Sequence, residues 1–75
     1  MNIIRIALDR VNGIEVSTIV IPDPLDSGYV AETLIGGGRN IGYKSIPQAV
    51  DAHRVIVKAL NDGVDYDEAL DAAGV

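Results

Sequence analysis

The pair Asn12-Gly13, set between two apolar runs, constrains the fold of this chain more than any other feature. Asn-Gly between alternating apolar residues is the strongest short-range signal of a β-hairpin, because both residues adopt the positive φ that a two-residue turn requires. Such a turn also fixes which residues face each other across the hairpin. The predicted cross-strand pairs are Val11 with Ile14, Arg10 with Glu15, Leu8 with Ser17, Ile6 with Ile19 and Ile4 with Ile21.

This register divides the hairpin side chains into two faces, because successive side chains of a strand point to opposite sides. One face holds five large aliphatic residues, and we expect it to be the core: Ile4, Ile6, Leu8, Ile19 and Ile21. The other face mixes polar residues with branched aliphatic ones. Its aliphatic residues are interpreted either as ordinary exposed side chains or as a subunit interface: Ile3, Val11, Ile14, Val16 and Val20.

The remainder of the chain predicts one more strand or two and two helices. Residues 29–35 alternate like a third strand, and Tyr43-Lys44 is a possible short fourth strand. Ser45 and Gln48 form a helix start, and Gly63 ends that helix. Its apolar stripe is Ile46, Ala49, Val50, His53, Ile56, Val57 and Leu60. A shorter helix is expected over residues 66–73. The predicted fold is therefore a single α+β domain over residues 1–75, a β-β-β-α two-layer sandwich in which the helix covers the isoleucine face.

Composition excludes several classes of function. The chain has 75 residues and no cysteine, so disulfides and thiolate metal sites are ruled out. Its net charge of −5 makes nucleic acid an improbable partner, because phosphate binding needs clustered Lys and Arg. No apolar run reaches the length of a membrane span and the first residues do not resemble a signal peptide. We expect a protein of the cytoplasm, without a cofactor or a metal.

The glycine-rich segment 36–42 is the first candidate site. Its sequence approaches a phosphate-binding P-loop, but Tyr43 separates Gly42 from Lys44, where that motif allows no insertion. A weaker hypothesis is that backbone amides of the loop and nearby cations hold an anion. The residues of this hypothesis are Gly36, Gly37, Gly38, Arg39 and Lys44. The alternative is a hairpin loop without a ligand.

Two titratable residues are further candidates. His53 lies on the apolar stripe of the helix, and no Ser or Cys is placed by spacing as its nucleophilic partner, so a structural role is favoured. Glu32 needs a partner if its face is buried, such as Arg54, His53 or Lys44. A Glu32–His53 pair would be able to do acid–base chemistry. The acidic residues near the C-terminus lack the spacing of a calcium loop and are interpreted as a solvated face.

The chain resembles small proteins of unknown function from actinobacterial genomes and their phages. The resemblance rests on Ser17-Thr18, on residues 32–37, on Tyr43-Lys44-Ser45 and on Ala49 with His53. It extends over residues 16–57. The aromatic residues of that group's second and third strands are replaced here by Val20 and by Leu34 or Ile35. The resemblance implies a phage or prophage context, but no mechanism.

A second resemblance is to HicB-type antitoxins, which have a β-β-β-α domain. It rests on Asp26-Ser27-Gly28-Tyr29-Val30-Ala31 and on the helix start Ser45-Ile46-Pro47-Gln48-Ala49. The Pro-Asp-Leu-Pro-Gly segment typical of that family and its DNA-binding tail are missing. This resemblance implies a binding module that inhibits a toxin.

The sequence therefore predicts a small non-enzymatic accessory protein, encoded by a phage or prophage, that forms homo-oligomers and binds a host or toxin protein. The mixed face of the hairpin, opposite the predicted core face, is the expected assembly surface. The alternatives are a protein that sequesters a phosphate or nucleotide with its Gly36–Gly42 loop, and a HicB-like antitoxin.

Overall fold

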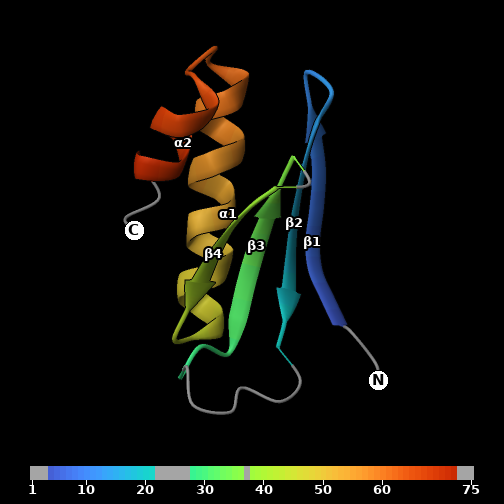
Figure 1. The fold of residues 1–75 in the computed structure, drawn as a ribbon, viewed down its shortest axis with the longest axis vertical. Helices are drawn as coiled ribbons and strands as arrows, with labels where there is room; N and C mark the ends of the chain where they lie inside the picture. Colours follow the sequence, from blue (N-terminus) through green and yellow to red (C-terminus); the bar gives the residue numbers. More distant parts are fainter. Residues whose placement is uncertain (1–3, 22–27, 37, 73–75) are drawn as a thin grey trace.

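The computed structural model describes residues 4–21, 28–36 and 38–72 of the chain. It contains four strands followed by two helices (Figure 1). The strands are β1 (Ile4–Val11), β2 (Ile14–Val20), β3 (Ala31–Ile35) and β4 (Arg39–Tyr43), and the helices are α1 (Ile46–Asn61) and α2 (Tyr66–Ala72). The strands form one antiparallel sheet in the order β1-β2-β3-β4. The predicted α+β class is confirmed, and a fourth strand is present, but it spans Arg39–Tyr43 and not Tyr43-Lys44, so it takes in much of the predicted glycine-rich loop.

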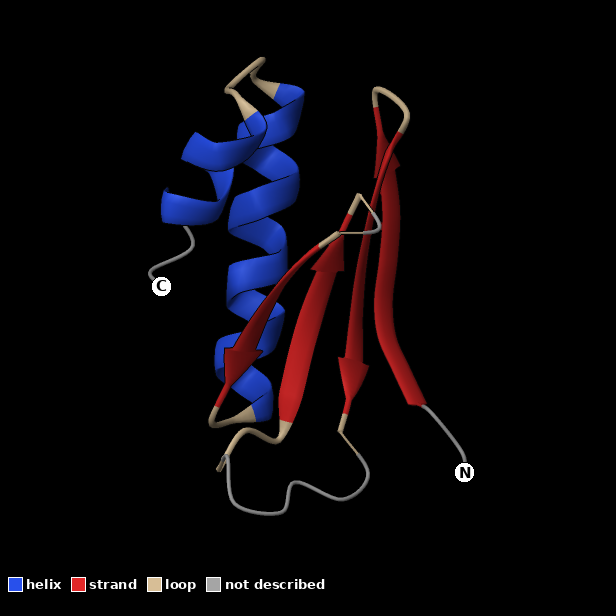
Figure 2. Ribbon diagram, viewed as in Figure 1, coloured by secondary structure: helices blue, strands red, loops and turns tan. Residues whose placement is uncertain are grey.

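The helices form the second layer of the molecule. Figure 2 shows α1 lying along one face of the sheet, where it contacts all four strands, while α2 packs on α1. Helix α1 begins as predicted, because the Ser45 hydroxyl accepts the backbone N–H of Gln48 at 3.2 Å. It ends at Asn61 with Asp62 as its cap, and the predicted terminating glycine, Gly63, follows with φ +84°. The two faces of the sheet therefore differ. We call the face under α1 the inner face and the opposite one the outer face.

The Asn12-Gly13 turn is confirmed. Both residues have positive φ, 51° and 83°, and the predicted pairs Val11–Ile14, Arg10–Glu15 and Leu8–Ser17 are present. Beyond them the register shifts by one residue between Arg5 and Ala7, so that Arg5 pairs with Ile19 and Ile4 with Val20. The predicted pairs Ile6–Ile19 and Ile4–Ile21 are therefore wrong. The shift is that of a β-bulge, in which one strand carries one extra residue, and the residue pattern of β1 does not predict it.

The predicted orientation of the hairpin is also wrong, because α1 covers the mixed face and not the isoleucine face. Val11 and Val16 are buried in the core, whereas Leu8, placed in the core by the sequence, is exposed. Two of the predicted interface residues are thus interior side chains. Ile14 is half-buried against the core and Val20 is half-buried, and Ile3 lies outside the described residues.

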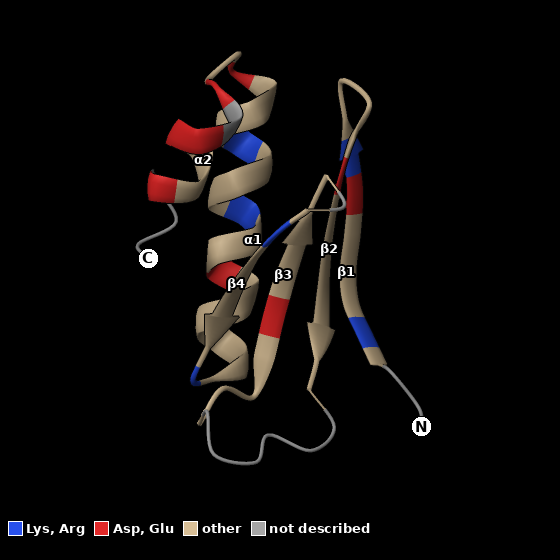
Figure 3. Ribbon diagram, in the orientation of Figure 1, with Lys and Arg blue, Asp and Glu red and all other residues tan. Residues whose placement is uncertain are grey.

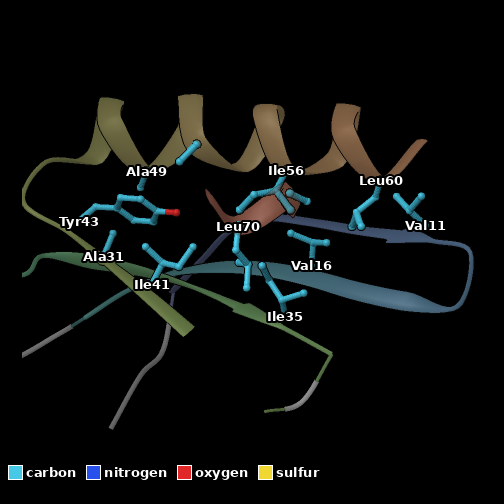
Figure 4. Close-up of a cluster of buried hydrophobic side chains, with 12 residues drawn as sticks. Val11, Val16, Ala31, Ile35, Ile41, Tyr43, Ala49, Ile56, Leu60 and Leu70 are labelled. Atoms are coloured by element: carbon cyan, nitrogen blue, oxygen red, sulfur yellow. The ribbon is translucent and has the colours of Figure 1, made fainter. Parts of the chain in front are cut away.

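The core is made of small and branched side chains contributed by every element. Figure 4 shows them between the sheet and α1, with Leu70 of α2 closing one side. The core cluster consists of Val11, Val16, Ala31, Ile35, Ile41, Tyr43, Ala49, Ala52, Ile56, Leu60, Ala69 and Leu70. The buried stripe of α1 agrees with the predicted one at Ala49, His53, Ile56 and Leu60. Ala49 and Ala52 are small, which lets the helix approach the sheet closely.

Candidate functional site

A chain of hydrogen bonds on the inner face of the sheet runs from β1 through the helix α1 to β2 and β3. The Asp9 carboxylate meets His53 Nε2 at 2.7 Å, and His53 Nδ1 meets the Thr18 hydroxyl at 2.7 Å. The Thr18 hydroxyl in turn lies 2.7 Å from that of Thr33. Asp9, Thr18 and Thr33 lie on neighbouring strands, and His53 faces them from α1. The chain therefore ties three strands to the helix.

With a neutral imidazole at His53, the donors and acceptors of this chain fit one arrangement of protons. A carboxylate accepts only, so His53 carries its proton on Nε2 and donates it to Asp9. Nδ1 then accepts the Thr18 O–H, and the Thr18 oxygen accepts the Thr33 O–H. Each hydroxyl donates once, so Thr18 and His53 are fully satisfied in the interior.

An acid, an imidazole and a hydroxyl in sequence are also the parts of a nucleophilic catalytic triad. Burial decides against that use here. The Thr18 side chain is 0% exposed and His53 is 4% exposed, so the hydroxyl has no surface that a substrate could reach. Thr18 also has both of its hydrogen-bonding partners inside the fold. We infer that the chain is structural: it fills the polar positions of a small core.

Glu32 lies on the opposite face from His53. Its carboxylate accepts the Asn40 side-chain amide at 3.2 Å, and its strand neighbours are Ile19 and Gly42. The Glu32–His53 pair considered from the sequence is therefore wrong, because the two residues are separated by the sheet. The partners of His53 are instead Asp9 and Thr18, two polar residues of the mixed hairpin face. The sequence does carry a signal for them: Asp9 and Thr18 are polar residues on one face of two paired strands, and the apolar stripe of the helix contains a histidine that needs polar partners.

The glycine loop uses its backbone amides inside the fold. Gly36 donates to the Glu15 carbonyl at 3.0 Å and Gly38 donates to the Ile35 carbonyl at 3.3 Å. Arg39 is held by Asp67 of α2 at 2.7 Å. Gly37 lies outside the described residues. Lys44 is exposed, and its backbone N–H is directed to Gln48 at 3.4 Å. Two amides and the guanidinium that an anion would need thus already have partners.

Tyr43 is a second buried polar group in the core. Burial raises the pKa of its phenol above the ordinary 10.0, and the nearby Thr33 hydroxyl opposes part of that rise. Thr33 does not complete a hydrogen bond of good geometry, and the Tyr43 hydroxyl is left without a partner. An unpaired buried hydroxyl is a net cost to folding.

None of the described elements packs on the outer face of the sheet (Figure 2). Leu8 is 46% exposed and Leu34 is 38% exposed. They flank Ser17 across β1, β2 and β3, and Asn40 of β4 completes the row. We call Leu8, Ser17, Leu34 and Asn40 the central row. A parallel row runs through Arg5, Ile19, Glu32 and Gly42.

The central row has raised and hollow positions. Ser17 is short and 5% exposed, sunk between the two leucines, and its hydroxyl has no partner. At the β4 end a hollow of about 350 Å³ is lined by Leu34, Gly38, Arg39 and Asn40. At Gly42, a Cβ would lie 2.8 Å from the ring of Tyr29, so the glycine makes room for that ring. The face therefore has relief that a partner surface could match.

The charges of the molecule are unevenly distributed between its two layers. Residues 46–72 carry six acidic and two basic residues, and Figure 3 shows most of the acidic ones on and around α2. The outer face carries two arginines and two glutamates, Arg5, Arg10, Glu15 and Glu32. The outer face is thus neutral on a chain of net charge −5.

Comparison of the chain with protein-family models, with curated proteins and with solved structures finds no match. The resemblances to the actinobacterial and phage proteins and to HicB-type antitoxins stay hypotheses. No described helix is long and apolar enough to cross a membrane.

Proposed function

We propose that this protein is a small non-enzymatic accessory protein that self-associates through the outer face of its sheet, and that the assembled form acts by binding another protein. The observation that carries the proposal is the uncovered central row, in which the two leucines, Leu8 and Leu34, are exposed. The surface differs from the predicted one: it is the opposite face of the same hairpin. The phage or prophage context is part of the proposal and rests on the resemblance alone.

Two further observations support binding over catalysis. The described residue best suited to acid–base chemistry, His53, is enclosed in the core with both ring nitrogens bonded. The outer face offers apolar relief and balanced charge, which suit a protein surface better than a nucleic acid.

The test is capture from host lysate with three forms of the full chain. The wild type, Leu34→Glu and Val55→Glu are immobilised at equal density. Val55 is 39% exposed on α1 and so is a matched control for an apolar-to-acidic change away from the outer face. We expect one protein to be retained by the wild type and by Val55→Glu but lost with Leu34→Glu. Retention that is equal for all three forms, or no retention at all, would refute binding through this face.

A further inference from the structure

We propose that the outer face binds a second copy of this chain in a two-fold arrangement whose axis runs parallel to the strands, so that β1 of each copy lies over β4 of the other. The inference rests on the proposed function and specifies its self-association. The occupant follows from charge. Two chains of net charge −5 repel one another, and their acidic helical layers are the least suitable surfaces to meet. The outer faces are neutral and apolar, so they can pack without that penalty.

The direction of the axis follows from the relief of the central row. Rotation about an axis parallel to the strands keeps each row level and reverses its order. Leu8 then lies over the partner's Asn40, where the hollow of about 350 Å³ opens, and Leu34 lies over the partner's Ser17, the sunken position. Because the contact is isologous, each copy supplies the same two projections and the same two recesses.

The neighbouring row agrees with this axis. Arg5 lies over the partner's Gly42, where the ring of Tyr29 packs, one strand away from the partner's Glu32. An arginine over an aromatic ring beside a carboxylate is a favourable position for the guanidinium.

The other two-fold axis of a face-to-face pair runs across the strands and fits poorly. It places β1 over β1 of the partner, so Leu8 and Leu34 meet their own copies and the recess at Ser17 stays empty. It also brings Arg5 toward the partner's Arg10, a pairing of like charges. Sheets of five to eight residues per strand give a footprint of roughly 400 Å² on each chain, or about 800 Å² in total, which is the size of a weak, transient interface, so we expect micromolar rather than nanomolar association.

Single cysteines introduced into this cysteine-free chain test the arrangement. Packed sheets lie about 10 Å apart, which suits a short bis-maleimide cross-linker better than a disulfide. Leu8→Cys and Asn40→Cys chains, one carrying a mass tag, are mixed and cross-linked. We expect a heterodimer from this mixture and little product from Leu8→Cys alone, since its two copies would lie a further three strand spacings apart, about 14 Å sideways. Val55→Cys mixed with Asn40→Cys is the control and should give no product.

The outcomes separate this inference from the proposed function. Cross-linking of Leu8→Cys with itself in preference to Asn40→Cys would overturn the axis while leaving self-association intact. The same holds for a chain that sediments as a dimer but gives neither product. A chain that sediments only as a monomer would overturn both the arrangement and the self-association. Circular dichroism of each variant confirms that the fold is retained.

Discussion

At the scale of single residues, His53 shows how a polar group is accommodated in a small core. Its ring nitrogens are hydrogen-bonded to Asp9 and Thr18 at 2.7 Å each, and the Thr18 hydroxyl is hydrogen-bonded to that of Thr33. The bonds join β1, β2 and β3 to α1. We expect their main value to be specificity of packing: they fix where the helix lies on the sheet.

The substitution Thr18→Val tests this role. Valine keeps the shape of threonine but leaves His53 Nδ1 without a partner, so we expect the free energy of unfolding to fall by about 1–3 kcal/mol. Thr33→Val is the matched comparison, because Thr33 makes one bond of the chain and leaves the histidine paired; its effect should be smaller. Chemical denaturation of both variants measures the difference. A Thr18→Val protein as stable as the wild type would show that the chain contributes nothing.

Tyr43 gives a pH-dependent prediction. Burial raises the pKa of its phenol in the folded state above 10.0, so the neutral phenol is favoured by folding. Below pH 10 both the folded and the unfolded state hold the phenol proton, so the stability does not change with pH through this group. As the pH rises through the raised folded pKa, the unfolded state loses its proton first and the protein loses stability.

Tyr43→Phe should therefore weaken the alkaline loss of stability, measured by denaturation at neutral pH and above pH 10. At neutral pH we expect stability to be unchanged or higher by about 1 kcal/mol, because the buried hydroxyl has no partner. An alkaline limb that is identical in the wild type and in Tyr43→Phe would contradict this assignment.

At the scale of elements, the hairpin divides what could be predicted from what could not. Asn12-Gly13 fixed the register as far as Leu8, because a two-residue turn leaves the first pairs no freedom. The bulge between Arg5 and Ala7 could not be foreseen, because an inserted residue leaves no mark on the alternation beyond it. The orientation failed for another reason. The more apolar face is the expected core, but the two faces have similar aliphatic content. Which face the helix covers depends on tertiary contacts, such as those of His53 on α1 with Asp9 and Thr18.

The candidate site divides in the same way. The alternation of side chains in β1 and β3 shows which residues share a face. It does not show which of the two faces α1 covers, because that depends on tertiary packing. Glu32 and Gly36 illustrate it: their proposed roles needed partners that the structure places elsewhere, at Asn40 and at the Glu15 carbonyl. The helix start at Ser45 was predictable because capping is local.

Gly13→Ala tests the turn. Gly13 has φ +83° and a Cβ there would meet no atom within 4 Å, so any effect comes from backbone strain alone. We expect a loss of about 1–2 kcal/mol in the free energy of unfolding. Gly38→Ala is a matched control in the other hairpin, because its Cβ also has open space and its φ is not in the left-handed region. Equal stability of the two variants would argue against a strained turn.

At the scale of the whole molecule, a sheet covered on one face only is common in antiparallel folds, where the second face is usually polar. Here the second face keeps Leu8, Leu34 and Tyr29 exposed and is electrically neutral, while the helical layer carries the negative charge. We propose that this division of charge limits association through the helical side and leaves the sheet side to pair.

The central claim is that the outer face of the sheet is the surface through which this protein associates. Sedimentation equilibrium over the micromolar range tests it most directly, with the wild type, Leu34→Glu and Val55→Glu compared. We expect the wild type and Val55→Glu to approach twice the chain mass of 7.9 kDa. Leu34→Glu should stay near the single-chain mass, with association weakened about tenfold or more, because two leucines per dimer leave apolar contact. A wild type that stays at the single-chain mass throughout, or a Leu34→Glu protein that associates as well as Val55→Glu, would contradict the claim.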